Sequence, residues 1–399
     1  MKILIALLFV FLGVNNLVFA QLFNSAYPLS TISADISTIS LANSTVAVTG
    51  DLADYHINPA GIGIDNTLEI TRRNKAFGLD GNLLYQEITG KIGRYAFAVS
   101  FRNINTGEIH LMGYRNPPYI HRPAAEDIMF NSSFAYSFVN GLSLGVGVNH
   151  GKLEDVLYVD QHEYKKEDVK KTSFNFGLLY KREVFENDKL LIEPSVGLSL
   201  NDYGKGIHFY RSNYKNPLPM TARIGSAVKI QTKETMFNQP LMEFNVMGGL
   251  SKIMSRTELK QDGEGNYYRR PMPPGKALTD SWDPMYQHNY NTGRMDTSKA
   301  WQQIWKQVGV EMKLLGTLSF RLGIENAAMF EDFLDKIAYG IGLDFYFLQF
   351  QYVHSFYVNG YDADLYSFEG GKHFQIIFRF PLANNTQKGI FNQFIKRSK

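Results

Sequence analysis

Histidine is the residue type in this sequence with the widest chemical range, because it can bind a metal or transfer a proton. The nine histidines are not spaced for either role, since no pair forms an HxH or HExxH pattern. The sequence has no cysteine, and its one GxSxG match, "GLSLG" at residues 141–145, lies in an alternating strand-like run and not at the strand-to-helix elbow of a nucleophilic serine. Most histidines fall in or beside segments expected to be outer loops, where a solvated side chain is the ordinary state. We therefore expect no enzyme, no cofactor and no metal site. The histidines are His56, His110, His121, His150, His162, His208, His288, His354 and His373.

Charged residues are more informative, because several fall on one face of alternating runs. Their signs are mixed, and two interpretations stay open. One is a hydrated ladder of paired charges that keeps a wall rigid. The other is a polar passage or a site for a ligand carboxylate. The candidates expected to face the interior are Arg102, Arg223, Glu243, Glu311, Arg321, Glu325, Asp344 and Arg379, with Lys181, Glu193 and Lys313 in the same phase.

The runs that carry these charges have a period of two, which is typical of strands whose two faces meet different surroundings. In "LSLGVGVN", residues 142–149, leucine and valine alternate with serine, glycine and asparagine. The same pattern predicts fourteen strands. They lie near 67–75, 82–92, 95–105, 127–139, 142–156, 172–183, 190–201, 220–232, 240–254, 304–316, 317–329, 337–347, 348–358 and 372–382.

The connections between these runs differ in length in a regular way. Short turns such as "GR" and "NG" alternate with longer polar segments, including 106–126, 157–171, 202–219 and 255–303. Antiparallel barrels of the outer membrane have short periplasmic turns and long external loops. The pattern therefore predicts an all-β fold, a 14-stranded antiparallel transmembrane β-barrel, with 255–303 as a long external loop. Stiff prolines and exposed aromatics in that loop fit either a lid over the barrel mouth or a docking surface.

The N-terminus predicts the compartment. Lys2, the apolar run "ILIALLFVFLGV" and the small residues of "VFA" form a secretory signal peptide with cleavage after Ala20. After Ala20 the sequence has no run of eighteen apolar residues, so no membrane-spanning helix is predicted. The formal net charge of +3 argues against a nucleic-acid partner. We expect a monomer in the cell outer membrane, in contact with its lipid.

Residues 21–66 precede the first strand and are rich in small side chains. A barrel of fourteen strands has a lumen wide enough to need filling, so this segment is expected to be a plug. In "DYHINPAGIG", Pro59 restricts the backbone and Asn58 can bond to its own turn. The residues Asn58, Pro59, Ala60 and Gly61 are expected to anchor the plug, although an ordinary turn before a strand would look the same.

This segment, "STVAVTGDLADYHINPAGIG", followed by fourteen strands, resembles the N-terminal hatch of the FadL-type outer-membrane transporter superfamily, including its PorV/PorQ-like branch. The resemblance implies passive uptake of a hydrophobic, long-chain fatty acid-like molecule past the hatch. The alternative that it implies is an interaction protein of type IX secretion, which holds secreted proteins at the surface through the 255–303 loop. The expected organisation is 1–20 signal peptide, 21–66 plug, 67–382 barrel and 383–399 basic tail.

Overall fold

A computed structural model describes the chain from the start of the plug region to the last strand, with gaps. The described residues are 33, 35–64, 67–77, 81–105, 109–112, 119–122, 126–138, 141–160, 163–208, 215–236, 239–261, 267–289, 294–327, 334–345, 347–357 and 371–381. The expected signal peptide and the basic tail lie outside these residues.

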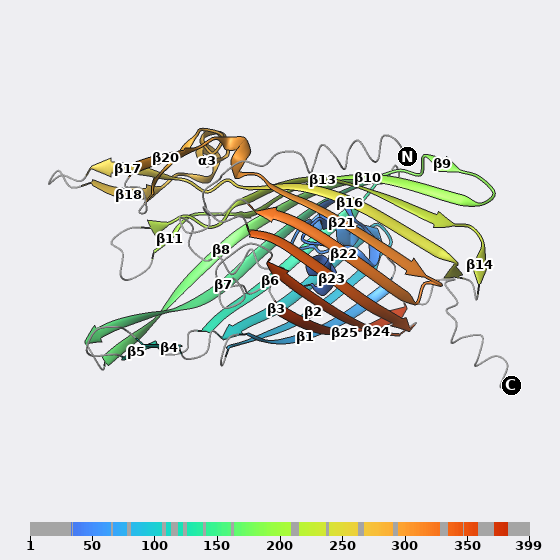
Figure 1. Ribbon diagram of the computed structural model, residues 1–399, viewed down its shortest axis with the longest axis horizontal. Helices are drawn as coiled ribbons and strands as arrows, with labels where there is room; N and C mark the ends of the chain where they lie inside the picture. The colour runs from blue at the N-terminus through green and yellow to red at the C-terminus, as the bar shows by residue number, and fades with distance from the viewer. Residues whose placement is uncertain are drawn as a thin grey trace.

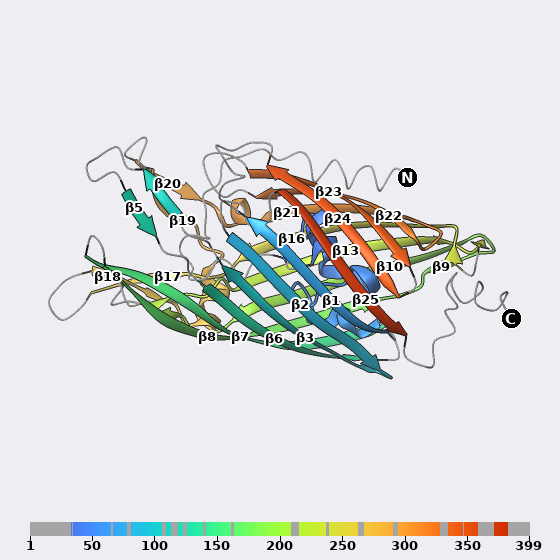
Figure 2. The same ribbon diagram turned by 90° about the horizontal axis from the view of Figure 1, so that it is seen from below.

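One antiparallel sheet of fifteen strands dominates the structure. One of the fifteen, β9 (Phe185–Glu186), is a two-residue addition to the edge of β10. The other fourteen each pair with a neighbour on both sides, because β25 pairs with β1 and β10 pairs with β13. The hydrogen-bonded order of strands therefore forms a ring (Figures 1 and 2).

The fourteen strands confirm the expected number, and each overlaps one predicted run. Alternation set these positions because it reports which residues share a face. The strands are β1 (Thr67–Phe77), β2 (Gly81–Ile92), β3 (Tyr95–Asn105), β6 (Glu126–Ser137), β7 (Leu142–Asp160), β8 (Glu163–Lys181), β10 (Leu190–Tyr203), β13 (Thr221–Thr232), β16 (Met242–Ile253), β21 (Trp305–Leu314), β22 (Leu318–Ala327), β23 (Leu334–Phe345), β24 (Leu348–Tyr357) and β25 (Gly371–Pro381).

The expected loop at 157–171 is wrong for most of its length. β7 and β8 continue as a paired hairpin up to Asp160 and Glu163. Cross-strand contacts such as the Lys152–Asp168 ion pair, at 2.9 Å, connect two polar strands that show no apolar alternation. The prediction from apolar alternation fails here because this hairpin extends beyond the ring, where both faces of a strand can carry polar side chains.

The other connections carry short elements that the sequence did not reveal. Figure 1 shows β11, the β17–β18 hairpin and α3 at the same end of the ring, while β9 and β14 lie at the other end. The 255–303 region holds two hairpins and a helix. The short elements are β4 (Ile109–Met112), β5 (Tyr119–Arg122), β11 (Ile207–His208), β12 (Lys215–Asn216), β14 (Thr235–Met236), β15 (Gln239–Pro240), β17 (Thr257–Gln261), β18 (Tyr267–Pro271), α3 (Pro274–Asp280), β19 (Met285–Asn289), β20 (Arg294–Ser298) and η6 (Ala300–Gln303).

The two faces of the ring have opposite character. On β7, Leu144, Val146 and Val148 are exposed, while Ser143 and Asn149 are buried, as the alternation predicts. Exposed apolar side chains recur outside other strands, for example Phe134, Leu198 and Leu322. Buried serine, asparagine and glutamine side chains line the inner face.

None of the helices in the described part of the chain is long and apolar enough to cross a membrane.

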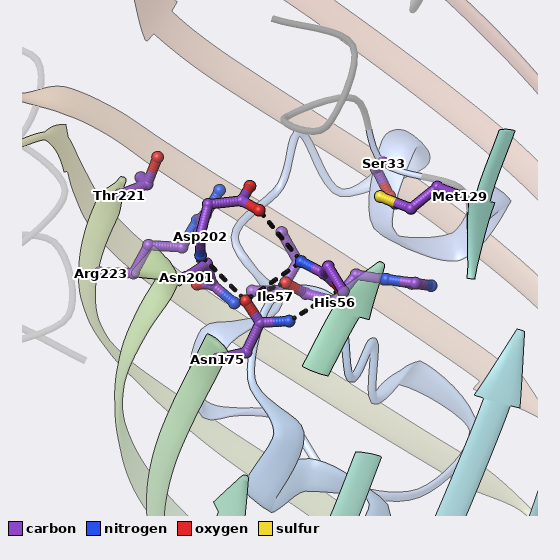
Figure 3. A pocket seen from close by; sticks show the side chains of 10 residues that line it. Ser33, His56, Ile57, Met129, Asn175, Asn201, Asp202, Thr221 and Arg223 are labelled. Carbon is purple, nitrogen blue, oxygen red and sulfur yellow. Dashed lines mark hydrogen bonds between the residues drawn. The ribbon is translucent and has the colours of Figure 1, made fainter. Parts of the chain in front are cut away.

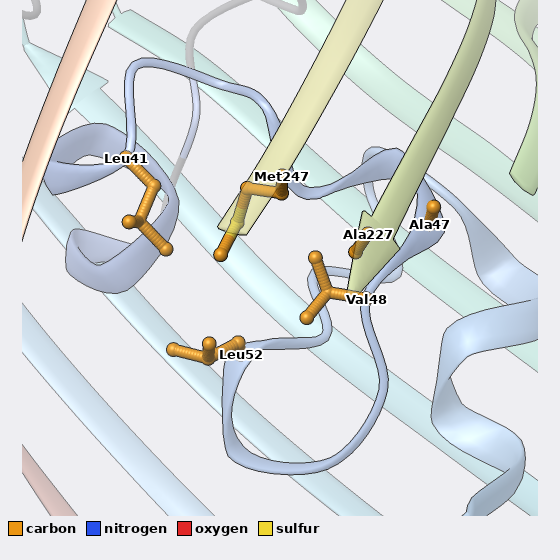
Figure 4. Close-up of a cluster of buried hydrophobic side chains, with 6 residues drawn as sticks. All are labelled: Leu41, Ala47, Val48, Leu52, Ala227 and Met247. Atoms are coloured by element: carbon orange, nitrogen blue, oxygen red, sulfur yellow. The ribbon is translucent and has the colours of Figure 1, made fainter. Parts of the chain in front are cut away.

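The N-terminal segment, of which residues 33 and 35–64 are described, lies within the ring (Figures 1 and 2). It contains α2 (Ile36–Ser40), η3 (Thr45–Ala47), η4 (Gly50–Leu52) and η5 (Pro59–Ile64). Its α2 contacts β22 to β25, η3 contacts β10, β13 and β16, and η5 contacts strands from β2 to β8. Part of the apolar core therefore sits between this segment and the wall. One cluster joins Leu41, Ala47, Val48 and Leu52 to Ala227 and Met247 of the sheet (Figure 4).

Candidate functional site

The predicted hatch turn is a compact, internally bonded unit inside the ring. The Oδ1 atom of Asn58 accepts a hydrogen bond from the backbone N–H of Ala60 at 3.0 Å. The Nδ2 atom of Asn58 donates to the carbonyl of Val46 at 2.7 Å and to that of Leu178 on β8 at 3.2 Å. One buried amide thus ties the turn to its own segment and to the wall. Pro59 begins η5, where its fixed φ suits a helical first turn.

Glycines on the facing strands allow this turn to approach the wall. A Cβ added at Gly145 of β7 would overlap the backbone of Pro59 and Ala60, and one at Gly177 of β8 would overlap Asn58. These two glycines are direct cross-strand partners. Beside them, the Ser143 hydroxyl donates to the carbonyl of Ala60 at 2.9 Å. The turn thus packs against the wall at Gly145 and Gly177, where the wall carries no side chain.

The same arrangement continues around the ring. A Cβ at Gly197 or Gly225 would overlap Val46, and one at Gly323 would overlap Leu41 and Ala42. We call these inward positions the glycine belt: Gly145, Gly177, Gly197, Gly225, Gly309 and Gly323, on β7, β8, β10, β13, β21 and β22. The backbone and short side chains of the N-terminal segment therefore pack closely against the wall where the wall carries no side chain. The sequence shows each glycine facing inward, but not what it contacts.

Most predicted inward charges form pairs along the wall. Arg321 Nε donates to Glu311 Oε1 at 2.8 Å, with both side chains buried, and Asn245 also donates to Glu311, at 2.9 Å. Glu243 pairs with Lys229 at 2.9 Å. Asp344 pairs with Lys313 at 3.2 Å. Unlike these, Glu325 accepts hydrogen bonds from Gln307 at 2.8 Å and from Asn43 of the N-terminal segment at 3.2 Å.

The eight candidates do not converge on one place. Arg102 and Arg223 lie apart from the ladder, near a polar pocket beside the N-terminal segment. Arg223 Nη1 donates to Asn201 Oδ1 at 2.6 Å, and Arg102 is buried with Nη2 3.5 Å from the Met129 sulfur. The side chain of Arg379 lies outside the described side chains, although its backbone pairs opposite Glu69.

The polar pocket lies beside a break in β10, and Figure 3 shows the side chains that line it. Asp202 has a φ of 54°, and the register between β10 and β8 shifts between Leu200 and Tyr203. This bulge turns the Asp202 carboxylate inward, where it accepts from Ser173 at 2.6 Å and Asn149 at 3.0 Å. The lining residues are Ser33, His56, Ile57, Met129, Asn149, Asn175, Asn201, Asp202, Thr221 and Arg223.

The N-terminal segment supplies His56 to this pocket. Its carbonyl accepts from Asn201 at 2.8 Å, and its Nε2 lies 3.2 Å from the Tyr85 hydroxyl. Burial within the ring, and secondarily the positive charge of Arg102, lower the pKa of His56 to about 3. The imidazole side chain of His56 is therefore neutral at physiological pH. The expectation of a solvated side chain applied to the histidines of the outer loops, and His56 lies instead in the enclosed N-terminal segment.

Asp54 lies two residues before His56 and is also buried. It accepts from the backbone N–H of His56 at 2.8 Å and from the Ser33 hydroxyl at 3.0 Å. Burial raises the pKa of the Asp54 carboxyl, while these hydrogen bonds oppose the increase. The pocket is suited to hydrogen bonding. In the described part of the chain, histidine, cysteine, aspartate and glutamate form no group of three that could hold a metal ion.

Sequence reasoning missed His56, Asn201 and Asp202 as a set. The only signal was "ND" at 201–202, where polar residues end the alternation of a strand. Asparagine and aspartate tolerate positive φ better than other side chains, so such a pair marks a place for a bulge. It does not reveal which segment lies opposite.

No protein-family model matches this chain, and no curated protein matches it. Among solved structures, the Pseudomonas putida toluene transporter TodX is 10% identical over 91% of this chain and 98% of its own, with a TM-score of 0.43. The Ralstonia pickettii toluene transporter TbuX is 11% identical over 86% and 96%, with a TM-score of 0.38. A Pseudomonas aeruginosa FadL homologue is 10% identical over 87% and 98%, also at 0.38. The fold described above stands on the strand pairings and not on these similarities.

Proposed function

We propose that this protein is an outer-membrane β-barrel that lets a hydrophobic small molecule enter the cell, with residues 21–66 as its plug. The exposed apolar side chains on the outside of the ring support a lipid environment. In lipid every backbone polar group must be paired, and a ring of strands achieves this. The buried contacts of the N-terminal segment with the wall support its role as the plug.

The observation that carries the proposal is apolar packing at the end of the ring where the long connections lie. One cluster consists of Met129, Val169, Ile207 and Leu218. A second consists of Met220, Met254 and Ala277, with Leu200, Tyr203 and Met272 packed against it. Methionine side chains are flexible and fill irregular space, so they adapt to ligands of different shape. A hydrophobic molecule entering from outside would meet these clusters before the polar pocket.

Met129 connects the two regions, because it belongs to the first cluster and also lines the polar pocket. A ligand that left the apolar cluster would therefore face hydrogen-bonding groups and the N-terminal segment. Exit would need either a rearrangement of that segment or a lateral gap in the wall. Long-chain fatty acids are one ligand class that fits such a path.

Mass spectrometry of the gently extracted protein tests the proposal. We expect co-purified fatty acids or other apolar molecules, and Met129→Asp should remove most of them without preventing assembly. Gln349→Glu on β24 is the matched control, since it also introduces a carboxylate on the inner face but outside both clusters. Extraction of a ligand-free protein that also fails to take up added fatty acid would contradict the proposal.

A second candidate is the retention of secreted proteins at the surface. The observation that favours it is the folded 255–303 region, where Trp282 is half exposed and Trp301 nearly so. Aromatic side chains are enriched at protein interfaces. Analysis of the same extract distinguishes the two candidates. A secreted protein that co-purifies in stoichiometric amount, and that is lost in the double variant Trp282→Ala and Trp301→Ala, would favour retention.

A further inference from the structure

Asp127 on the inner face of β6 is a buried carboxylate that accepts no hydrogen bond from the described residues. Its side chain is only 1% exposed. Neither Oδ1 nor Oδ2 has a hydrogen-bond partner in the part of the chain that the structure describes. Burying a carboxylate without compensating hydrogen bonds costs free energy. A group that donates a hydrogen bond to Asp127 would recover part of that cost.

Apolar residues surround this carboxylate on the inner wall. Met129 lies two positions along the same face of β6. Leu153 of β7 pairs directly with Asp127, and Val169 of β8 pairs with Leu153. Met129 and Val169 belong to the first apolar cluster, and Leu153 packs against it. The carboxylate therefore borders the apolar cluster that the proposed ligand would enter.

A positive charge lies close to the same place. Gly151 of β7 pairs with Met129 on one side and with Lys171 of β8 on the other. Lys171 is buried and acts electrostatically on Asp127. It also lies 4.0 Å from Asp202 of the polar pocket. The neighbourhood of Asp127 thus combines a carboxylate acceptor with a compensating cation, so a neutral ligand group is favoured over a charged one.

We propose that Asp127 is the binding residue for a hydroxyl group on an otherwise hydrophobic ligand. The ligand's O–H donates to the carboxylate, and its apolar body packs against Met129, Val169 and Leu218. This inference rests on the proposed uptake function and specifies its substrate class as neutral hydrophobic alcohols or phenols. A fatty acid would bind with its carboxylate turned away from Asp127, and the positive charge of Lys171 offsets the attraction of Asp127 for an ammonium ligand.

Three probes with the same aromatic body test the inference: ethylbenzene, 2-phenylethanol and 2-phenylethylamine. Their affinities are measured by equilibrium dialysis of the full-length protein in detergent, with empty micelles as the blank. A hydrogen bond to a charged group predicts that 2-phenylethanol binds about tenfold more tightly than ethylbenzene. The amine should bind more weakly than the alcohol.

Substitution of Asp127 supplies the decisive comparison. Asp127→Leu should abolish the preference for the alcohol while ethylbenzene still binds. Asp127→Asn, which keeps the size of the side chain, should reduce the preference several-fold and serves if the leucine variant does not assemble. Asp168→Asn is the control, because Asp168 is an exposed aspartate on β8, two strands from β6, and is paired with Lys152.

The outcomes separate the two proposals. Binding of ethylbenzene and 2-phenylethanol with equal affinity, or a preference that survives Asp127→Leu, would overturn the hydroxyl site and leave the uptake function standing. Tightest binding of the amine would also overturn it. Absence of binding by all three probes would overturn the hydroxyl site, while binding of added fatty acid by the extracted protein tests the uptake function separately.

Discussion

Val146 and Gly147 are neighbours in β7 whose positions face opposite sides of the wall. Val146 is 51% exposed on the outside, whereas a Cβ at Gly147 would meet the Ser133 hydroxyl inside. We expect Val146→Arg to destabilise the protein by roughly 2–4 kcal/mol, because its charge would face the middle of the bilayer. Gly147→Ser should cost about 1 kcal/mol, since the Ser133 hydroxyl can rotate away. Folding titrations into lipid vesicles measure both, and equal costs would contradict a lipid-facing exterior.

His56 gives the site a dependence on pH. Its pKa is about 3 in place and 6.5 when released, so the released segment binds the proton between these values. The free energy that holds the N-terminal segment should therefore fall on acidification, by up to about 2 kcal/mol between pH 7 and pH 5. The raised pKa of Asp54 acts in the opposite direction, because protonation favours its buried state.

The comparison of wild type with His56→Gln isolates the histidine, since Asp54 is present in both. Protease cleavage of the N-terminal segment at pH 7.5 and pH 5 measures the difference. We expect acid to accelerate cleavage in the wild type more than in His56→Gln. The same acid response in both proteins would remove His56 from the explanation.

At the scale of elements, the contact between η5 and β7 decides how the N-terminal segment is held. Gly145 lies against the backbone of Pro59 and Ala60, which cannot move aside as a side chain can. We expect Gly145→Ala to displace the turn at a cost of about 1–3 kcal/mol. In planar bilayers it should show flickering conductance that the wild type lacks. Gly147→Ala on the same strand is the control, because its added methyl group would overlap only the Ser133 hydroxyl, so the barrel should stay closed. Equal conductance of the two variants would contradict the proposed packing at the glycine belt.

At the scale of the whole molecule, the two ends of the ring should lie on opposite sides of the membrane. Lys276 of α3 and Asp188 of the β9–β10 turn are exposed at the two ends. Because the sequence has no cysteine, single cysteines at these positions label cleanly. Lys276→Cys should react with an impermeant reagent on intact cells, and Asp188→Cys only after the outer membrane is opened. Labelling of both on intact cells would refute this topology.

Removal of the N-terminal segment tests what fills the ring. Residues 35–56 contribute α2, η3 and η4, and their hydrogen bonds reach Gln351 and Gln375 on the far strands. Deleting them leaves the fourteen strands and the Asn58–Gly61 turn. We expect a heat-modifiable barrel that conducts ions steadily in planar bilayers, while the intact protein is nearly closed. A deleted protein that folds and stays closed would mean that other residues fill the lumen.

The sequence by itself determined the strands, because alternation reports directly which side chains share a face. It placed all fourteen long strands and predicted that the side chain of Val146 faces outward. It also located the Asn58–Pro59 turn from the restricted φ of proline. It failed at 157–171, where a polar hairpin extends beyond the ring without two contrasting environments.

Only the tertiary structure decided which inward residues meet. Glu311 pairs with Arg321, and Asn43 reaches Glu325, across 282 positions of sequence. The N-terminal segment was expected inside the ring, but the sequence did not show that His56 lines a pocket with Asn201 and Asp202. The sequence did not show that Asp127 is buried without a hydrogen-bond partner among the described residues, because that depends on which strands and loops surround it. Such contacts depend on ring closure and on a bulge at Asp202, and strand periodicity carries no information about either.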